Sequence, residues 1–348
     1  MYRFMLNLPV SDTQDDKLVN IKEIKDALRG LAKQTETDQP SEKAASEQTK
    51  YRSYDQLKEA FDQMGLNVRS DLEVIRELIL NFKSSDQLSR TQILTDLEYY
   101  LHQIDNAKNF VDMGGLELVK KSLNDSSSEL RKAAAYLLAG AALNNPHVQI
   151  AALEQGLLHD FIHKLPAETF FDNRGRYLSA VGALIRNFPL AQKKFVQLGG
   201  LDLFVNILSD STSFGSDSTN YKHKLRVVTV ISDLLSERVQ LESPDKISQY
   251  EEVRLPLFLR QKGWCSQLPL LLQIDDLDVQ EKVINAMNLS IDLCWQEFGR
   301  FGSLLGSVRT GLERLILDDS EQQFEFLRDM AADLDSVLGR ISMAKDEL

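Results

Sequence analysis

Apolar residues recur along this chain at helical spacing, inside units that repeat between residues 106 and 210. Three segments share the same order of apolar positions around a glycine, namely NAKNFVDMGGLELVKKSLND (106–125), VQIAALEQGLLHDFIHKLPA (148–167) and AQKKFVQLGGLDLFVNILSD (191–210). The dipeptides Gly115-Leu116, Gly156-Leu157 and Gly200-Leu201 align them at spacings of 41 and 44 residues. Those spacings lie in or near the range of stacked two- or three-helix repeats.

Each unit is predicted to contain three helices. The first is short and ends at the glycine, which suits the left-handed turn after a helix. The second is apolar, and the third is longer, over 128–145, 173–188 and 221–237. Along 173–188 the apolar residues keep the i, i+3, i+6, i+7, i+10 spacing of one buried stripe. A fourth unit is predicted over 253–294.

This pattern predicts an all-α protein, an armadillo-like superhelical solenoid of about four repeats with helical caps at both ends. The caps are needed because the outermost repeats would otherwise expose their stacking faces. The polar composition of the first 50 residues is typical of a flexible arm. We expect an arm over 1–50, an N-terminal cap over 51–105, repeats over 106–295, a C-terminal cap over 296–344 and a signal over 345–348.

Charge and hydropathy narrow the class of partner. The chain has 40 basic and 52 acidic residues, a formal net charge of −12. An acidic chain does not have the broad basic surface of a nucleic-acid-binding protein, so protein partners are favoured. No apolar run reaches the roughly 18 residues needed to cross a bilayer, and no membrane insertion is expected.

The two ends of the chain carry different signals for localisation. The last four residues, Lys345, Asp346, Glu347 and Leu348, form the tetrapeptide read by the receptor that returns proteins to the endoplasmic reticulum. The first residues, MYRFMLNLPVSDTQDD, do not have the pattern of a signal peptide. We therefore expect the endoplasmic reticulum lumen, with the retrieval receptor as a partner and the signal peptide not present in this chain.

Two cysteines and two glycosylation sequons lie in the repeats. Cys265 and Cys294 are expected to be buried thiols that pack as small hydrophobes, with a disulfide as the alternative. The sequon at Asn124 falls in a turn between helices and is a candidate glycosylation site in a lumenal chain. The sequon at Asn288 falls inside a helix, where an unmodified asparagine is expected.

Motifs for catalysis are missing from the sequence. There is no Gly-rich phosphate loop, dinucleotide fingerprint or nucleophile elbow. His159 and His163 are four residues apart, but they lack the glutamate of a zincin pair and a third ligand. We therefore expect no enzyme activity, no cofactor and no metal site.

The third helices of an armadillo-like solenoid line its concave surface, where partners bind. On the predicted register, seven polar or aromatic side chains project from these helices at helical spacing and are the candidate partner-binding residues. The aromatic and arginine members are the best candidates for energetic hot spots. For Lys222 and Arg226 the alternative is a solvated basic helix start. The seven residues are Lys132, Tyr136, Asn144, Arg176, Asn187, Lys222 and Arg226.

A series of segments resembles one known family. The chain is similar to the armadillo-type nucleotide exchange factors of heat-shock chaperones, and among them to the lumenal Sil-type factors that serve the chaperone BiP. The resemblance covers about 51–343, in order and with similar spacing. The segments are DLEYYLHQIDNAKNFVDMGGLELV (96–119), NNPHVQIAALEQGLLHDFIHKL (144–165), RNFPLAQKKFVQLGGLDLFVNIL (186–208), LRVVTVISDLLSE (225–237) and LRQKGWCSQL (259–268).

The resemblance implies a function that depends on binding. Such factors hold lobe II of the chaperone's ATPase domain with the concave armadillo surface, displace or rotate that lobe and release ADP. They support protein folding and translocation in the endoplasmic reticulum, and the N-terminal arm can contact the substrate-binding part of the chaperone. The alternative is an armadillo adaptor that binds extended peptides without exchange activity. The tryptophan and asparagine ladders of peptide-binding armadillo grooves are missing here, which disfavours the adaptor.

Overall fold

The computed structural model describes residues 54–64, 69–210, 221–239, 241, 243–318 and 325–346. The predicted arm over 1–50 and the last two residues of the terminal tetrapeptide, Glu347 and Leu348, lie outside the described residues. The chain divides into two compact units, 1–74 and 75–348. In the first unit the described helices are α2 (Tyr54–Gln63) and the start of α3 (Asp71–Ser84).

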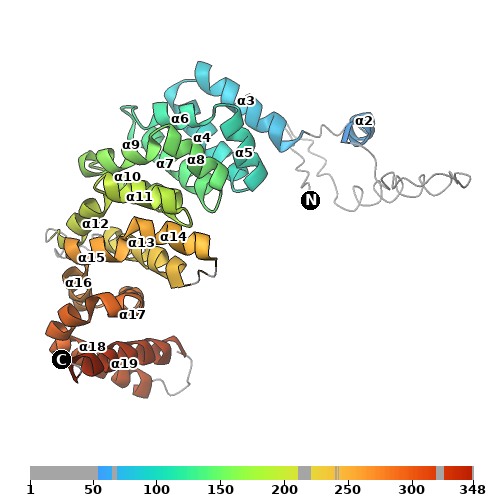
Figure 1. The fold of residues 1–348 in the computed structure, drawn as a ribbon. Helices are drawn as coiled ribbons and strands as arrows, with labels where there is room; N and C mark the ends of the chain where they lie inside the picture. The colour runs from blue at the N-terminus through green and yellow to red at the C-terminus, as the bar shows by residue number, and fades with distance from the viewer. Residues whose placement is uncertain are drawn as a thin grey trace, which may run out of the picture. The chain divides into compact units, whose positions relative to one another are not determined.

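The described part of the second unit consists of helices, turns and loops, without strands. After the remainder of α3, the elements follow one another in chain order (Figure 1). They are α4 (Gln87–Leu101), α5 (Ile104–Asp112), α6 (Leu116–Ser122), α7 (Ser128–Ala142), α8 (Pro146–Glu154), α9 (Leu157–Lys164), η1 (Leu165–Ala167), α10 (Phe171–Ile185), α11 (Pro189–Gln197), α12 (Gly200–Ser209), α13 (Tyr221–Val239), α14 (Pro244–Val253), α15 (Leu255–Lys262), α16 (Trp264–Gln267), η3 (Pro269–Gln273), α17 (Leu277–Phe298), η4 (Gly299–Phe301), α18 (Gly302–Asp318) and α19 (Glu325–Asp346).

These helices form the predicted armadillo-like repeats. The first three units are α5-α6-α7, α8-α9-α10 and α11-α12-α13, and the fourth is α15-α16-α17, with α14 inserted before it and packed on α11. The long helices α4, α7, α10, α13, α17 and α19 each pack against the next one. One continuous apolar core runs from α3 to α19, as expected when each repeat buries its face only against its neighbours.

Glycines in the left-handed conformation end the first helix of each unit. They are Gly114, Gly156, Gly199 and Gly263, with φ between 76° and 90°. The first three are spaced by 42 and 43 residues. The sequence alignment, which paired Gly156 with Gly115 and Gly200, was therefore wrong by one residue in the second unit, because that unit is the one of the three aligned units with a single glycine at this turn.

The second glycine of each pair has a different role, since an aromatic ring lies over it. A Cβ on Gly115 would lie 2.3 Å from the ring of Phe110, and Gly200 has the same relationship to Phe195. The second unit has Ala152 and Leu157 at the equivalent positions. In the second unit the small residue thus occupies the position of the aromatic ring, and the large residue occupies the position of the glycine. The turn therefore keeps a similar packed volume.

Local signals explain where the third helices begin and end. Ser127 and Asp276 each accept a backbone N–H of the first turn, of α7 and α17 respectively, which stabilises a helix start. The α7 and α10 helices are followed by Asn144 and Asn187, both in the left-handed conformation with φ of 54° and 55°. Asparagine tolerates this conformation better than most residues.

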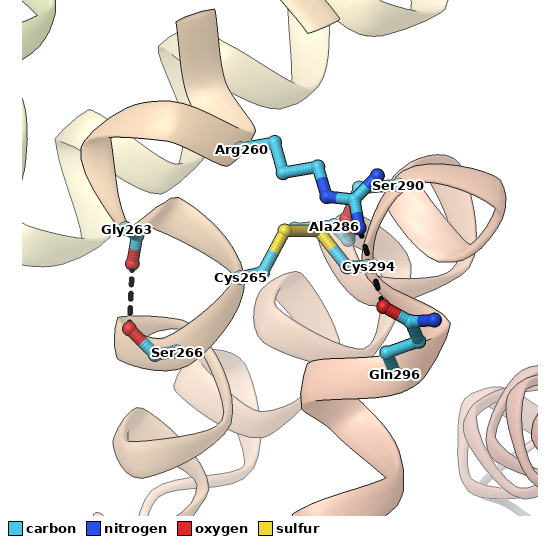
Figure 2. The surroundings of a disulfide bond; sticks show 8 residues. All are labelled: Arg260, Gly263, Cys265, Ser266, Ala286, Ser290, Cys294 and Gln296. Atoms are coloured by element: carbon cyan, nitrogen blue, oxygen red, sulfur yellow. Dashed lines mark hydrogen bonds between the residues drawn. A yellow bond between two sulfur atoms is a disulfide. The ribbon is translucent and has the colours of Figure 1, made fainter. Parts of the chain in front are cut away.

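The two cysteines form a disulfide, which corrects the expectation of two separate thiols. Cys265 on α16 and Cys294 on α17 are 5.2 Å apart between Cα atoms, and both are buried. Figure 2 shows the bond between the two helices, with Nη2 of Arg260 donating to Oε1 of Gln296 beside it at 3.2 Å. The sequence could not show that the short α16 turns its cysteine toward α17.

Within the described residues, every helix is too short or too polar to cross a membrane.

Candidate partner-binding groove

A groove of about 540 Å³ runs along the third helices α7, α10, α13 and the start of α17. Its wall combines small or apolar side chains with cationic ones. The lining residues are Tyr136, Ala139, Gly140, Leu143, Arg176, Ser179, Ala183, Arg186, Lys222, Leu225, Arg226, Thr229, Val230 and Lys282. We call this surface the third-helix groove.

Tyr136 and Arg176 join the first two helices of the groove. The guanidinium carbon of Arg176 lies 4.0 Å from the centre of the Tyr136 ring, at the distance of a cation–π contact. The Tyr136 side chain is still 38% exposed. The pair therefore offers a flat aromatic and cationic surface to a partner.

Arg226 reaches from α13 to α10 because Gly175 has no side chain. A Cβ on Gly175 would lie 2.5 Å from Nη1 of Arg226. Partial burial against the wall, and then the charge of Arg176, lower the pKa of Arg226 from its usual value. Its outer side remains exposed. Two guanidinium groups thus lie close enough to repel each other.

Arg186 belongs to the same wall and is fixed from two sides. Its Nε donates to Oδ2 of Asp233 at 2.6 Å, and its carbonyl accepts from Nε2 of Gln149 at 2.9 Å. A Cβ on Gly182 would lie 2.5 Å from Nη1 of Arg186, so this glycine leaves room for the side chain. The arrangement links α10 to α8 and α13.

The groove is cationic although the chain is acidic. Five of its lining residues are lysine or arginine, and none of those described is aspartate or glutamate. The whole chain has a net charge of −12. Such a local reversal of sign attracts an acidic ligand to one surface.

The structure brings four of the seven predicted residues together in this groove: Tyr136, Arg176, Lys222 and Arg226. The other three lie outside its lining. Lys132 pairs with Glu129, Nζ to Oε2, at 2.7 Å. Asn144 and Asn187 lie beyond the helix ends, where Nδ2 of Asn187 donates to Oδ1 of Asn144 at 2.9 Å.

Two cations of the groove were missed from the sequence, Arg186 and Lys282. Lys282 is the sixth residue of α17, as Arg176 is of α10 and Arg226 of α13. Counting from the helix starts would have found it. Arg186 follows the last residue of α10 and reaches the groove only because Gly182 is small, so no periodicity indicates it. Lys282 forms an ion pair with Asp278.

Residues 106–342 match the family described as the SIL1/FES1/HPBP1 C-terminal domain. This stretch contains the first three units, from residue 106 in α5 to the end of α13, and the whole third-helix groove. The chain belongs to this family. Its relatives in the SIL1/FES1/HPBP1 family include proteins named nucleotide exchange factor SIL1. The protein from Xenopus laevis is 31% identical over 323 residues, covering 89% of this chain and 69% of the relative.

A second branch of the SIL1/FES1/HPBP1 family is more distant. A protein of Candida glabrata named Hsp70 nucleotide exchange factor FES1 is 28% identical over 195 residues, covering 56% of this chain and 61% of the relative. Among solved structures, a designed armadillo repeat protein has a TM-score of 0.54 at 16% identity, covering 77% of this chain and 99% of that chain. This likeness confirms the armadillo-like fold.

Two glutamates, one buried and one half-buried, hold the helices that carry the groove. Glu168 accepts from Nε of Arg131 at 2.9 Å and from the hydroxyl of Tyr177 at 3.3 Å. Burial favours a higher pKa, but the hydrogen bonds, that of Arg131 foremost, prevail and lower the pKa of Glu168 to about 2. The carboxylate thus joins α7 to α10 as a charged group.

The second glutamate, Glu237 near the end of α13, is held differently. It accepts from the backbone N–H of Asn187 at 2.9 Å, from Nε2 of Gln192 at 2.7 Å and from the hydroxyl of Tyr250 at 3.1 Å. Burial raises the pKa of this carboxyl. Three elements, the end of α10, α11 and α14, are thereby attached to α13.

Proposed function

We propose that this protein is a nucleotide exchange factor for an Hsp70-type chaperone, and that it binds the chaperone's ATPase domain through the third-helix groove. The membership of residues 106–342 in the SIL1/FES1/HPBP1 family carries the proposal. Relatives in two branches of that family are named nucleotide exchange factors. The contact residues we propose are Tyr136, Arg176, Lys222 and Arg226 in the groove, together with Lys132, Asn144 and Asn187 outside its lining.

The mechanism is differential binding. A factor that binds the open arrangement of lobe II more tightly than the closed, nucleotide-loaded arrangement shifts the chaperone toward the open one. Nucleotide and factor then weaken each other's affinity by the same ratio, typically about 5- to 150-fold. No bond is made or broken, so the factor needs neither a catalytic residue nor a nucleotide site of its own.

The compartment we propose is the endoplasmic reticulum lumen, with BiP as the chaperone and the retrieval receptor as a second partner. The tetrapeptide at 345–348 supports this localisation. The disulfide between Cys265 and Cys294 is a second, independent support, because such bonds persist in oxidising compartments.

A lumenal chain can be glycosylated, and the structure favours Asn124 as the acceptor. Asn124 is exposed in the turn between α6 and α7, although its side chain also contacts Lys164 at 2.7 Å. Asn288 instead donates from α17 to Oδ1 of Asp333 on α19 at 3.1 Å. A glycan there would separate two packed helices. The N124Q variant is therefore expected to lose the mass released by a glycosidase, while N288Q retains it.

Release of a fluorescent ADP analogue from purified BiP tests the exchange function. In a stopped-flow experiment, the release rate is expected to rise with the concentration of this protein and then saturate. A folded protein that does not change the rate would overturn the proposal. Binding of extended peptides without such acceleration would identify the adaptor instead.

A further inference from the structure

Among the described residues, three cations of the third-helix groove have no counter-ion. Arg186 and Lys282 are paired with Asp233 and Asp278. Across the described residues, no ion pair is formed by Arg176, Lys222 or Arg226, although all three line the same groove.

Leaving these charges unpaired has a physical cost. Like charges that share a site destabilise each other, and an anion placed between them relieves the repulsion. Arg176 is held in place by the Tyr136 ring and Arg226 by the space above Gly175. Because the guanidinium groups are already positioned, less side-chain entropy is lost when they bind an anion.

The remaining wall of the groove is largely apolar. The lining includes Ala139, Leu143, Ala183 and Leu225 together with the cationic side chains, and Leu143 is 50% exposed. A phosphate ion would leave this apolar surface uncovered. A polypeptide that places an apolar side chain on the wall and carboxylates on either side would cover both kinds of surface. The groove itself has the aromatic and arginine residues that are enriched at protein interfaces.

We infer that the third-helix groove binds an acidic segment of the protein partner, which places an apolar side chain between α7 and α10 and carboxylates on Arg176, Lys222 and Arg226. The inference rests on the proposed function, since it assigns to the Hsp70-type partner the chemistry that this groove recognises. It assigns an acidic charge pattern to the partner's surface, which family membership alone does not indicate.

Charge reversal tests the inference directly. The R176E and K222E variants are compared with K246E on α14 and R314E on α18, which are exposed cations outside the groove. Binding of the nucleotide-free BiP ATPase domain is measured by calorimetry at low and moderate salt, after circular dichroism has shown that each variant is folded. We expect R176E and K222E to weaken binding at least 10-fold and to reduce its salt dependence, while the two controls change it less than 2-fold.

A second measurement separates an acidic protein segment from a small anion. Inorganic phosphate and ADP are titrated into the exchange factor alone, and we expect no micromolar binding. Micromolar binding that R176E abolishes would show a small-anion site and overturn the inference. A charge-restoring test follows in the complex: lysine substitutions of acidic residues on the BiP surface should recover affinity for R176E.

The outcomes distinguish the inference from the proposed function. If the wild-type protein does not bind BiP or accelerate ADP release, the proposed function fails. If it does both while R176E and K222E behave like K246E and R314E, the function stands and the acidic segment is wrong.

Discussion

The ring of Phe195 occupies the space that a side chain on Gly200 would need: a Cβ on Gly200 would lie 2.1 Å from Cε2 of that ring. Both residues are buried at the turn between α11 and α12. The turn can therefore accept a larger residue only if the aromatic ring moves.

The G200A variant is expected to destabilise the protein by about 2 kcal/mol, the usual cost of overpacking a core. The matched control is G306A on α18, where a Cβ would meet nothing within 4 Å. Alanine there is expected to stabilise the helix by about 0.5–1 kcal/mol. Denaturant unfolding followed by circular dichroism measures both. Equal effects of the two substitutions would contradict the packing at the Gly200 turn.

Loss of the disulfide is expected to destabilise the fourth unit. Cys265 and Cys294 are 29 residues apart, and closing a loop of that length contributes about 3.5 kcal/mol. The C265S/C294S double variant should therefore melt at a lower temperature than the wild type. A reducing agent should lower the wild-type melting temperature to that of the double variant and leave the double variant unchanged. An unaltered melting temperature in both tests would be inconsistent with a stabilising bond.

Glu168 and Glu237 should respond to pH in opposite directions. The pKa of Glu168 is about 2 in the folded protein against 4.5 for the free group, so its charge stabilises the fold above pH 4.5. That contribution, ~3 kcal/mol, is lost as the pH falls toward 2. The pKa of Glu237 is raised, so its contribution is present below pH 4.5 and is lost as the pH rises through the folded pKa.

The glutamine variants compare these two carboxyls. At pH 7 we expect E168Q to lose ~3 kcal/mol of unfolding free energy. We expect E237Q to lose about 1–2 kcal/mol, because its amide has one acceptor oxygen for the three donors that meet the carboxyl group. Unfolding free energies from pH 3 to 8 provide the measurement. A larger loss at pH 7 for E237Q than for E168Q would reverse the assignment of the two groups.

Asn187 provides a test of backbone conformation. Its φ of 55° lies in the left-handed region. This conformation destabilises most residues by roughly 1–2 kcal/mol, and asparagine and glycine by less. We expect N187A to be less stable than N187G by about 1 kcal/mol, as measured by denaturant unfolding. Both variants lose the hydrogen bond to Asn144, so their difference isolates the conformation. An N187G variant less stable than N187A would contradict the turn.

Much of the fold was predictable because the helical spacing of apolar residues and the repeated segments are both visible in the sequence. The stripe of Leu178, Val181 and Leu184 gave the third helix of the second unit, and all three residues are buried. The register at the glycine turns was not predictable from the dipeptides, since Gly115 and Gly156 look equivalent in sequence and only the latter has a positive φ.

The groove was predictable only in part. Tyr136, Arg176, Lys222 and Arg226 were found because they lie at helical spacing on third helices. Arg186 was not predicted, because its position depends on the missing side chain of Gly182. The bond between Cys265 and Cys294 was not predicted either, because it depends on how two helices face each other. Contacts of this kind arise from packing between helices, which periodicity within one helix does not contain.

The disulfide also has a consequence for how the protein opens. It joins two helices of the same unit, so no disulfide cross-links one unit to another. In a chain of repeats that touch only their neighbours, local stability then differs from one unit to the next. Amide hydrogens of α17 should therefore exchange more slowly than those of α7 and α10. The unit that contains the disulfide is expected to be the last to unfold locally.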